Sequence, residues 1–274
     1  MDEITAPYAV RELVEEVPLR VHLSTRVAAK TDLGRVRENN EDKFEFFVPS
    51  SDALLASRGH VYLVCDGMGG HSAGQIASEL AAKTFIDVYL NHPASEASVA
   101  AVAAAHAANR FVRDVGTAIP SRRGMGTTLS GLMLIQDQAM IIQIGDSRVY
   151  RLRDGVLDQI TTDHTWVEDV VQKGLMPRED AERHQYKHVI MQAIGGDADL
   201  APDVFWLDLM PGDEFLLCSD GLTNHVSNPE LHEVLAAAGP SEACWQLVNL
   251  ALAGGGSDNC TALIVSVDAV TAVN

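Results

Sequence analysis

Apolar and polar residues alternate along much of the chain in short runs that turn signals interrupt. From Arg20 onward the alternation has a period of two, which is typical of β-strands. It predicts strands near residues 21–29, 43–48, 60–65, 127–135, 139–144, 148–153, 204–209, 213–218 and 260–267. Short turns join several of these runs, and the Asp-Gly turn inside Tyr150-Arg-Leu-Arg-Asp-Gly-Val-Leu157 predicts an antiparallel hairpin.

Other segments have the period of a helix. They predict helices near residues 73–90, 96–114, 165–174, 178–184, 228–238 and 241–253. Because long helices are separated by blocks of antiparallel strands, we expect an α+β fold. It would be a β-sandwich flanked by helices and not a doubly wound parallel sheet.

The chain shows no compositional break that would divide it into two large domains. We expect residues 1–22 to form an N-terminal extension and residues 23–270 to form a single domain. In the extension, apolar residues from Val10 to Val17 fall on one face of a short helix that would end at Pro18. We expect this helix to pack against the domain, and docking of a partner is the alternative.

The chain is strongly acidic. Its 274 residues include 20 Lys and Arg against 38 Asp and Glu, a net charge of −18. This charge opposes binding to nucleic acids or to anionic membranes, both of which attract basic surfaces. It does not oppose the binding of divalent cations, although we expect most of the acids only to keep the surface soluble.

The sequence also bears on the compartment. The start of the chain lacks the basic and apolar regions of a signal peptide, and no apolar run reaches 18 residues, so we expect a cytoplasmic protein. The four cysteines are widely spaced, and most lie in apolar strand-like runs, so we expect buried thiols without disulfides or a zinc site.

Aspartates recur where predicted strands end. Asp66, Asp146 and Asp220 follow apolar runs, and Asp258 precedes the last strand. If these strands are neighbours, four carboxylates gather at one edge and repel one another. Hard cations such as Mg²⁺ or Mn²⁺ would offset that repulsion, since they prefer oxygen ligands.

Glycines directly follow two of these aspartates. Gly67 and Gly221 would let a backbone carbonyl approach a cation closely. A single Asp-Gly after a strand is more simply a turn. The repetition at several strand ends favours the metal site.

Arg37 stands four residues before Glu41 and Asp42. An arginine among acids is often a surface ion pair of at most about 1 kcal/mol. Arginine is also the side chain best shaped to hold a phosphate with two hydrogen bonds. A phosphate held beside paired cations would describe phosphoester hydrolysis, because two metals activate a water and neutralise developing charge.

Seven motifs together resemble, in order, the metal-dependent type 2C protein serine/threonine phosphatases, and above all the bacterial members. The resemblance extends from about Thr25 to Val267. The motifs are GRVRENNED (34–42), VCDGMGGHSAGQIAS (64–78), GMGTTLSGLML (124–134), IGDSRVYRLRDG (144–155), QITTDH (159–164), LLCSDGL (216–222) and SDNCTALIV (257–265).

The resemblance implies a central sandwich with helices on both outer faces, a four-layer α-β-β-α arrangement. It implies two Mn²⁺ or Mg²⁺ ions at one edge, and a third, looser ion in bacterial members. The implied ligands of the paired ions are Asp66, the Gly67 carbonyl, Asp220 and Asp258. Asp146 matches the residue that helps to hold the third ion, Glu41 and Asp42 match acids that act through water, and Arg37 matches the phosphate-binding arginine.

One position departs from the eukaryotic pattern. Met68 stands where those relatives have a histidine that serves as general acid, and methionine cannot donate a proton. His71 or a metal-bound water would take the role, and His71 is equally suited to capping or packing at the following helix. His184 and His188 are four residues apart, but two ligands do not complete a metal site, so we expect flap or surface histidines.

The sequence argues against other classes. Neither Cys65 nor Cys218 begins the C-x5-R loop of cysteine-based phosphatases, and no phosphate-binding P-loop occurs. A catalytically silent scaffold is the remaining alternative, and such a protein would be expected to have lost the metal carboxylates.

We therefore expect a metal-dependent phosphatase that hydrolyses phosphoserine and phosphothreonine through a metal-bridged water, with no phosphoenzyme. Its expected partners are phosphorylated proteins and a bacterial Ser/Thr kinase system, and we expect a monomer. A segment at about 164–196 corresponds to the variable flap beside the site of these relatives.

Overall fold

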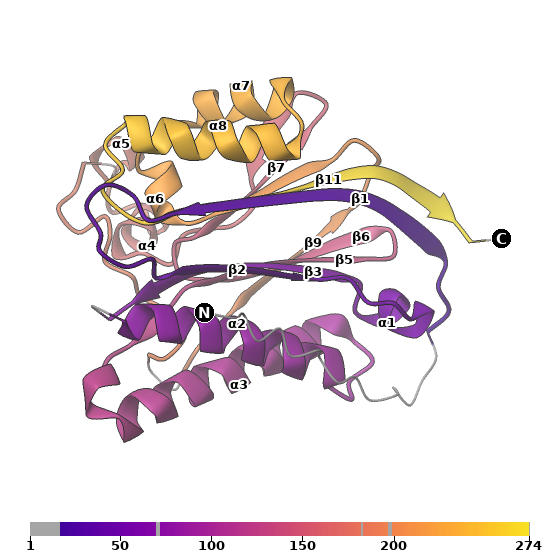
Figure 1. Ribbon diagram of the computed structural model, residues 1–274, viewed down its shortest axis with the longest axis horizontal. Helices are drawn as coiled ribbons and strands as arrows, with labels where there is room; N and C mark the ends of the chain where they lie inside the picture. The colour runs from indigo at the N-terminus through magenta and orange to yellow at the C-terminus, as the bar shows by residue number, and fades with distance from the viewer. Residues whose placement is uncertain (1–16, 70–71, 182, 197–198, 274) are drawn as a thin grey trace.

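The computed structural model describes residues 17–69, 72–181, 183–196 and 199–273. Two antiparallel sheets pack face to face, and helices cover the outer face of each sheet (Figure 1). This is the four-layer α+β sandwich that the sequence predicts. The amphipathic helix expected before Pro18 lies outside the described residues.

The first sheet has five strands, and the second has six, of which five form one continuous path. The first sheet has the order β1 (Val21–Asp32), β11 (Cys260–Ala272), β10 (Glu214–Cys218), β7 (Arg148–Arg153) and β8 (Val156–Gln159). The second has the order β2 (Asp42–Phe47), β3 (His60–Met68), β5 (Leu129–Ile135), β6 (Gln138–Ile144) and β9 (Asp203–Asp208), with the short β4 (Gly126–Thr127) beside β3. Each strand that the sequence predicts is present, and the hairpin of β7 and β8 has its turn at Asp154 and Gly155, both with positive φ.

Helices α2 (Ala73–Asn91) and α3 (Ala97–Ala118) cover the second sheet, and α7 (Asn228–Ala237) and α8 (Pro240–Ala253) cover the first (Figure 1). Alanines along α2 and α3 allow the two helices to pack closely, since their small side chains are fully buried between them. The short elements are α1 (Asp52–Ser57), the 3-10 turn η1 (Pro120–Arg122), α4 (Trp166–Gln172), α5 (Arg178–Ala181) and α6 (Asp220–Thr223). The sequence analysis predicted neither α1 nor α6.

The apolar strand β3 is buried on both faces and ends at the edge of the sandwich. Its alternate residues Val61, Leu63 and Cys65 pack toward α2, while Tyr62 and Val64 pack into the core between the sheets. The strand is therefore buried on both faces, as its unbroken apolar sequence requires. Asp66 lies near the edge of the sandwich, two residues before β3 ends at Met68.

The four cysteines are free and buried, as expected from their apolar surroundings. Within the described residues, the longer helices contain too few apolar residues in sequence to span a lipid bilayer.

Candidate metal and phosphate site

The acidic residues at the ends of the predicted strands meet at one edge of the sandwich, the edge at which α6 lies (Figure 1). Asp66 lies near the end of β3, Asp146 just after β6, Asp220 just after β10, and Asp258 just before β11. All three other carboxylates are close enough to raise the pKa of Asp66. The structure therefore brings together four residues that are up to 192 positions apart in the sequence (258 − 66).

Two threonines hold the backbone of Asp66 in place. The Asp66 N–H donates to the Thr128 hydroxyl at 2.8 Å, and the Asp66 carbonyl accepts from the Thr127 hydroxyl at 2.8 Å and from the Thr128 N–H at 2.9 Å. The backbone of Asp66 is satisfied within the protein. Its carboxyl group is left to face the other acids.

The pKa values of these carboxyl groups report crowding. Burial, followed by repulsion from Asp42 and Asp220, raises the pKa of Asp66 well above its usual range. Burial and then Asp220 raise the pKa of Asp146 to about 7. Burial and then Asp258 raise the pKa of Asp220, and interactions with Asn224, His188 and Asp66 offset part of that increase.

Asp42 contributes more than the sequence predicted. It lies opposite Asp66 in the register of β2 and β3, and its Oδ2 accepts hydrogen bonds of 2.7 Å from Ser219 and from Thr261. Its Oδ1 is buried and has no hydrogen-bond partner, and burial raises the pKa of the group to about 7. Ser219 belongs to the LLCSDGL motif and Thr261 to the SDNCTALIV motif. Asp42 therefore links β2 by hydrogen bonds to the segments that contain Asp220 and Asp258.

The glycines of the site are required by close approaches of the backbone. A Cβ atom on Gly67 would lie 2.2 Å from the Gly74 carbonyl oxygen, and one on Gly221 would lie 1.9 Å from the Asn259 carbonyl oxygen. Either contact would force the chains apart. The predicted role of the Gly67 carbonyl as a ligand stays a prediction, and this packing is a further reason for both glycines.

Glu41 is fixed next to Gly67. The Gly67 N–H donates to the Glu41 carbonyl at 3.1 Å, and the Glu41 N–H donates to Asn259 Oδ1 at 2.8 Å. A Cβ atom on Gly74, at the start of α2, would lie 2.7 Å from Glu41 Oε2. The Glu41 carboxylate thus lies against the first turn of α2.

Arg37 lies at the same edge. Its Nη2 donates to Asp258 Oδ2 at 2.7 Å, and this hydrogen bond raises the pKa of Arg37, with smaller contributions from Glu41 and Asp66. The ion pair that the sequence analysis considered is present. Because its partner is one of the predicted ligands, the pair also places the guanidinium where a phosphate would meet the cations.

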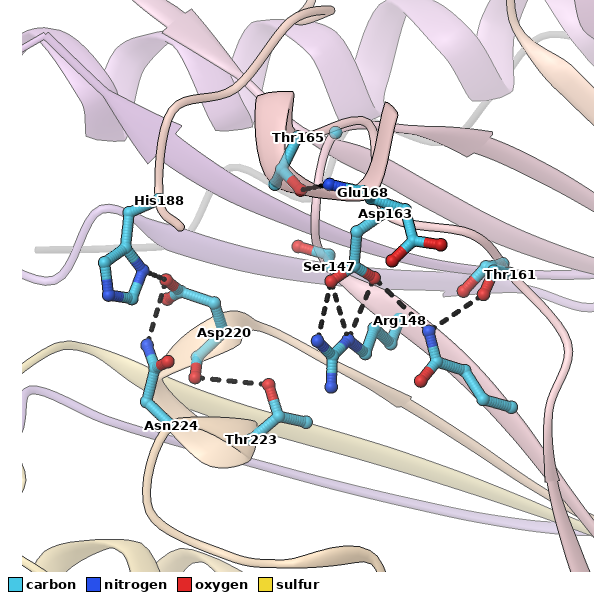
Figure 2. Close-up of polar contacts among 12 residues, drawn as sticks. Ser147, Arg148, Thr161, Asp163, Thr165, Glu168, His188, Asp220, Thr223 and Asn224 are labelled. Atoms are coloured by element: carbon cyan, nitrogen blue, oxygen red, sulfur yellow. Dashed lines mark hydrogen bonds and ion pairs between the residues drawn. The ribbon is translucent and has the colours of Figure 1, made fainter. Parts of the chain in front are cut away.

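The flap brings a histidine to the site that the sequence analysis assigned only to the flap or the surface. His188 Nδ1 lies 3.8 Å from Asp220 Oδ2, whose other neighbour is Asn224 Nδ2 at 3.1 Å (Figure 2). His184 instead packs against Trp166, with ring centroids 5.2 Å apart. His71 lies outside the described residues, and Met68 ends β3 opposite Gly126.

These residues fit hard divalent cations. The available ligand atoms are oxygens, one buried oxygen of Asp42 has no partner, and burial together with neighbouring carboxyl groups raises the pKa of Asp42, Asp66 and Asp146. Within the described part of the chain, no three acidic, histidine or cysteine side chains are spaced to hold one ion by themselves. Water molecules and the Gly67 carbonyl would therefore complete the coordination shell.

The chain matches the model of one protein family, protein phosphatase 2C, over residues 35–245. It is 38% identical to the serine/threonine protein phosphatase PstP of Mycobacterium tuberculosis, over 90% of this chain and 46% of that protein. It is 34% identical to the serine/threonine phosphatase stp of Listeria monocytogenes, over 87% of this chain and 94% of that protein. The chain thus spans about half the length of PstP and nearly all of stp.

Solved structures agree with this match. The catalytic domain of PstP in complex with 2 manganese ions superposes with a TM-score of 0.77 at 35% identity, covering 90% of this chain and 100% of that chain. The serine/threonine phosphatase of S. agalactiae gives a TM-score of 0.82 at 31% identity, covering 89% and 100%. With these matches, and with the motif residues gathered at one edge of the sandwich, the chain belongs to the protein phosphatase 2C family.

Proposed function

We propose that the protein is a metal-dependent phosphatase that hydrolyses phosphoserine and phosphothreonine on proteins, with Mn²⁺ or Mg²⁺ as cofactor. The observation that carries this proposal is the convergence of Asp66, Asp220 and Asp258 with Arg37 at one edge of the sandwich. The names of the relatives and the two manganese ions of the PstP structure support it.

Each side chain has a role in this proposal. Asp66, Asp220 and Asp258, with the Gly67 carbonyl, would hold the paired ions, Asp146 would help to hold a third, and Glu41 and Asp42 would act through water. When bound, the cations would supply an activated water and neutralise charge on the phosphoryl oxygens. Arg37 would leave Asp258 for the phosphate, to which it can donate two parallel hydrogen bonds.

A direct attack by water is favoured over a phosphoenzyme. The thiols nearest the site, Cys65, Cys218 and Cys260, are fully buried, and burial raises the pKa of each. A protonated, buried thiol is a poor nucleophile. Rapid quench of a single turnover with a ³²P-labelled phosphopeptide checks the step: no ³²P on the protein is expected, and ³²P-labelled protein formed within one turnover would refute direct attack.

We further propose a single catalytic domain at residues 23–270, a flap at about 164–196, and a monomer that opposes a Ser/Thr kinase in the cytoplasm. The general acid is proposed to be His71 or a water.

The deciding experiment is hydrolysis of a phosphopeptide panel and of a small aryl phosphate, with Mn²⁺ and with EDTA. Turnover with Mn²⁺ that EDTA abolishes is expected. Metal-loaded, folded protein that leaves every phosphomonoester intact would overturn the proposal and favour the catalytically silent scaffold.

A further inference from the structure

His164, at the root of the flap, makes contacts that link the flap to the loop of Asp146. The His164 N–H donates to the Gly145 carbonyl at 2.8 Å, and the Gly145 N–H donates to His164 Nδ1 at 3.3 Å. Main chain and side chain of His164 together bind both backbone polar groups of the residue before Asp146. The side chain of His164 is only 8% exposed.

These contacts fix the tautomer of the imidazole ring. A backbone N–H can only donate, so Nδ1 must be the unprotonated acceptor and Nε2 must carry the proton. Nε2 lies 3.1 Å from Asp203 Oδ2 at the start of β9, which accepts this proton's hydrogen bond. Asp203 thereby orients the ring toward Gly145, as a carboxylate that accepts from one ring nitrogen of a histidine does in other proteins.

The loop on the other side of this contact is tightly held. Gly145 has a φ of +98°, and a Cβ there would lie 2.5 Å from Thr128 Cγ2. Gln143 Nε2 donates to the Gly145 carbonyl at 3.0 Å and to the Ser147 carbonyl at 2.6 Å. The contact with His164 therefore joins the flap to a loop that is already fixed on its inner side.

The other end of the flap, at Ile194, also contacts the segments that form the site. Ile194 and Thr127 exchange backbone hydrogen bonds of 2.8 and 2.9 Å, and the Thr127 hydroxyl donates to the Asp66 carbonyl. Between the two roots, Met191 N–H donates to the His164 carbonyl at 2.7 Å, which closes the base of the flap. Movement of the flap would be transmitted to the segments that carry Asp66 and Asp146.

We infer that His164, oriented by Asp203, is a positioning residue that couples the flap to Asp146 and so sets the affinity of the cation that Asp146 helps to hold. The inference rests on the proposed role of Asp146. Coupling is reciprocal, so a cation bound at Asp146 stabilises the closed base of the flap to the same extent.

The test uses two substitutions that each keep one ring nitrogen's function. His164→Asn places an oxygen near the Nδ1 position and keeps the acceptor for Gly145, whereas His164→Gln places a donor near Nε2 and loses that acceptor. His184→Gln is the matched control, because His184 is a flap histidine that packs on Trp166. Calorimetric Mn²⁺ titration, kcat and KM for an aryl phosphate, and hydrogen exchange of the flap are measured for each.

We expect His164→Gln to weaken the lowest-affinity Mn²⁺ site by about tenfold and to lower kcat at saturating aryl phosphate with KM unchanged. In His164→Gln, Mn²⁺ should protect the backbone amides of the flap from hydrogen exchange less than it does in the wild type. His164→Asn and His184→Gln should stay within about threefold of the wild type. Equal Mn²⁺ binding by His164→Asn and His164→Gln would overturn the inference.

If both His164 variants fail to fold, Asp203→Asn and Asp203→Ala replace them. Asn keeps an acceptor for Nε2–H, so only Ala should weaken Mn²⁺ binding, and equal binding by both again overturns the inference. The proposed function fails separately, if the wild type binds Mn²⁺ but hydrolyses no phosphomonoester.

Discussion

An aspartate lies near each end of strand β10, and the two have different surroundings. Before the strand, Asp213 has a fully buried side chain whose oxygens accept from the Arg153 guanidinium, at 2.6 Å for Nη2, and from the Met210 N–H at 2.9 Å. After the strand, the partly exposed Asp220 has a raised pKa, owing first to burial and then to Asp258. Burial of an aspartate is therefore not by itself the mark of a cation site.

The difference lies in where the compensating positive charge comes from. Arg153, on β7, supplies it to Asp213 from within the chain. At the other end, Asp42 and Asp220 raise the pKa of Asp66, and the Arg37 guanidinium donates to Asp258. A divalent cation would offset repulsion among these carboxylates, so loss of one aspartate should affect activity at one end and stability at the other.

The largest expected effect is the loss of activity in Asp220→Asn. Metal ligation supplies several kcal/mol of transition-state stabilisation, so kcat/KM should fall by about a thousandfold. The melting temperature in EDTA should stay the same or rise, because a source of repulsion is removed. A metal-free variant that melts well below the wild type would show that Asp220 is structural, like Asp213.

At the other end of β10, loss of the aspartate should lower stability and leave activity unchanged. Asp213→Ala leaves Arg153 without its partner and should lower the free energy of unfolding by about 3 kcal/mol, measured by urea denaturation. The kcat/KM of the folded fraction should match the wild type. Asp213→Asn, which keeps an acceptor, should lose less, and an equal loss would show that hydrogen bonding to Arg153 is unimportant.

The carboxyl groups gathered around Asp66 should make the stability of the protein depend on pH. Folding raises the pKa of Asp42 and Asp146 to about 7, from about 4 in the unfolded chain. The folded state therefore binds more protons between about pH 4 and 7, and this contribution to stability is lost as the pH rises through that window. Melting in EDTA at pH 5 and pH 7.5 should show a larger fall for the wild type than for Asp146→Asn, and equal falls would contradict the raised pKa of Asp146.

A smaller effect is expected for Arg37→Ala. Loss of the guanidinium should raise KM for an aryl phosphate by about tenfold, since a charge-assisted hydrogen bond is worth about 1.5–3 kcal/mol. Mn²⁺ affinity should be unchanged by calorimetry. Weaker Mn²⁺ binding would show that Arg37 serves mainly to orient Asp258.

The smallest effect is expected for His188→Asn. The side chain is about half exposed and 3.8 Å from Asp220, so the pair should contribute little, and KM should change by about threefold or less. His184→Asn is the control, because it changes a flap histidine that packs on Trp166. A hundredfold loss of kcat in His188→Asn alone would assign the missing general acid to the flap.

Most of the fold could be predicted because its strands are defined by local alternation and its long helices by local periodicity. The elements that were missed are single turns: α1 has little more than the Ser51 cap and two leucines, and α6 begins at Asp220 itself. Strand β3 ends at Met68, later than the predicted residue 65, and β10 begins at Glu214, one residue later than predicted. Their ends depend on pairing with neighbours that the local sequence does not identify.

The site could be predicted to the extent that it lies at strand ends. Motif order placed Asp66, Asp146, Asp220 and Asp258 together because neighbouring strands share an edge. The bonds from Ser219 and Thr261 to Asp42, and the position of His188 beside Asp220, depend on tertiary packing between segments more than 30 residues apart. No local pattern records such contacts.

The most direct measurement is anomalous diffraction at the manganese edge from crystals soaked in MnCl₂. Two peaks bounded by the Asp66, Asp220 and Asp258 carboxylates are expected, with a weaker third peak at Asp146. Well-ordered density for these carboxylates with no anomalous peak between them would contradict the account.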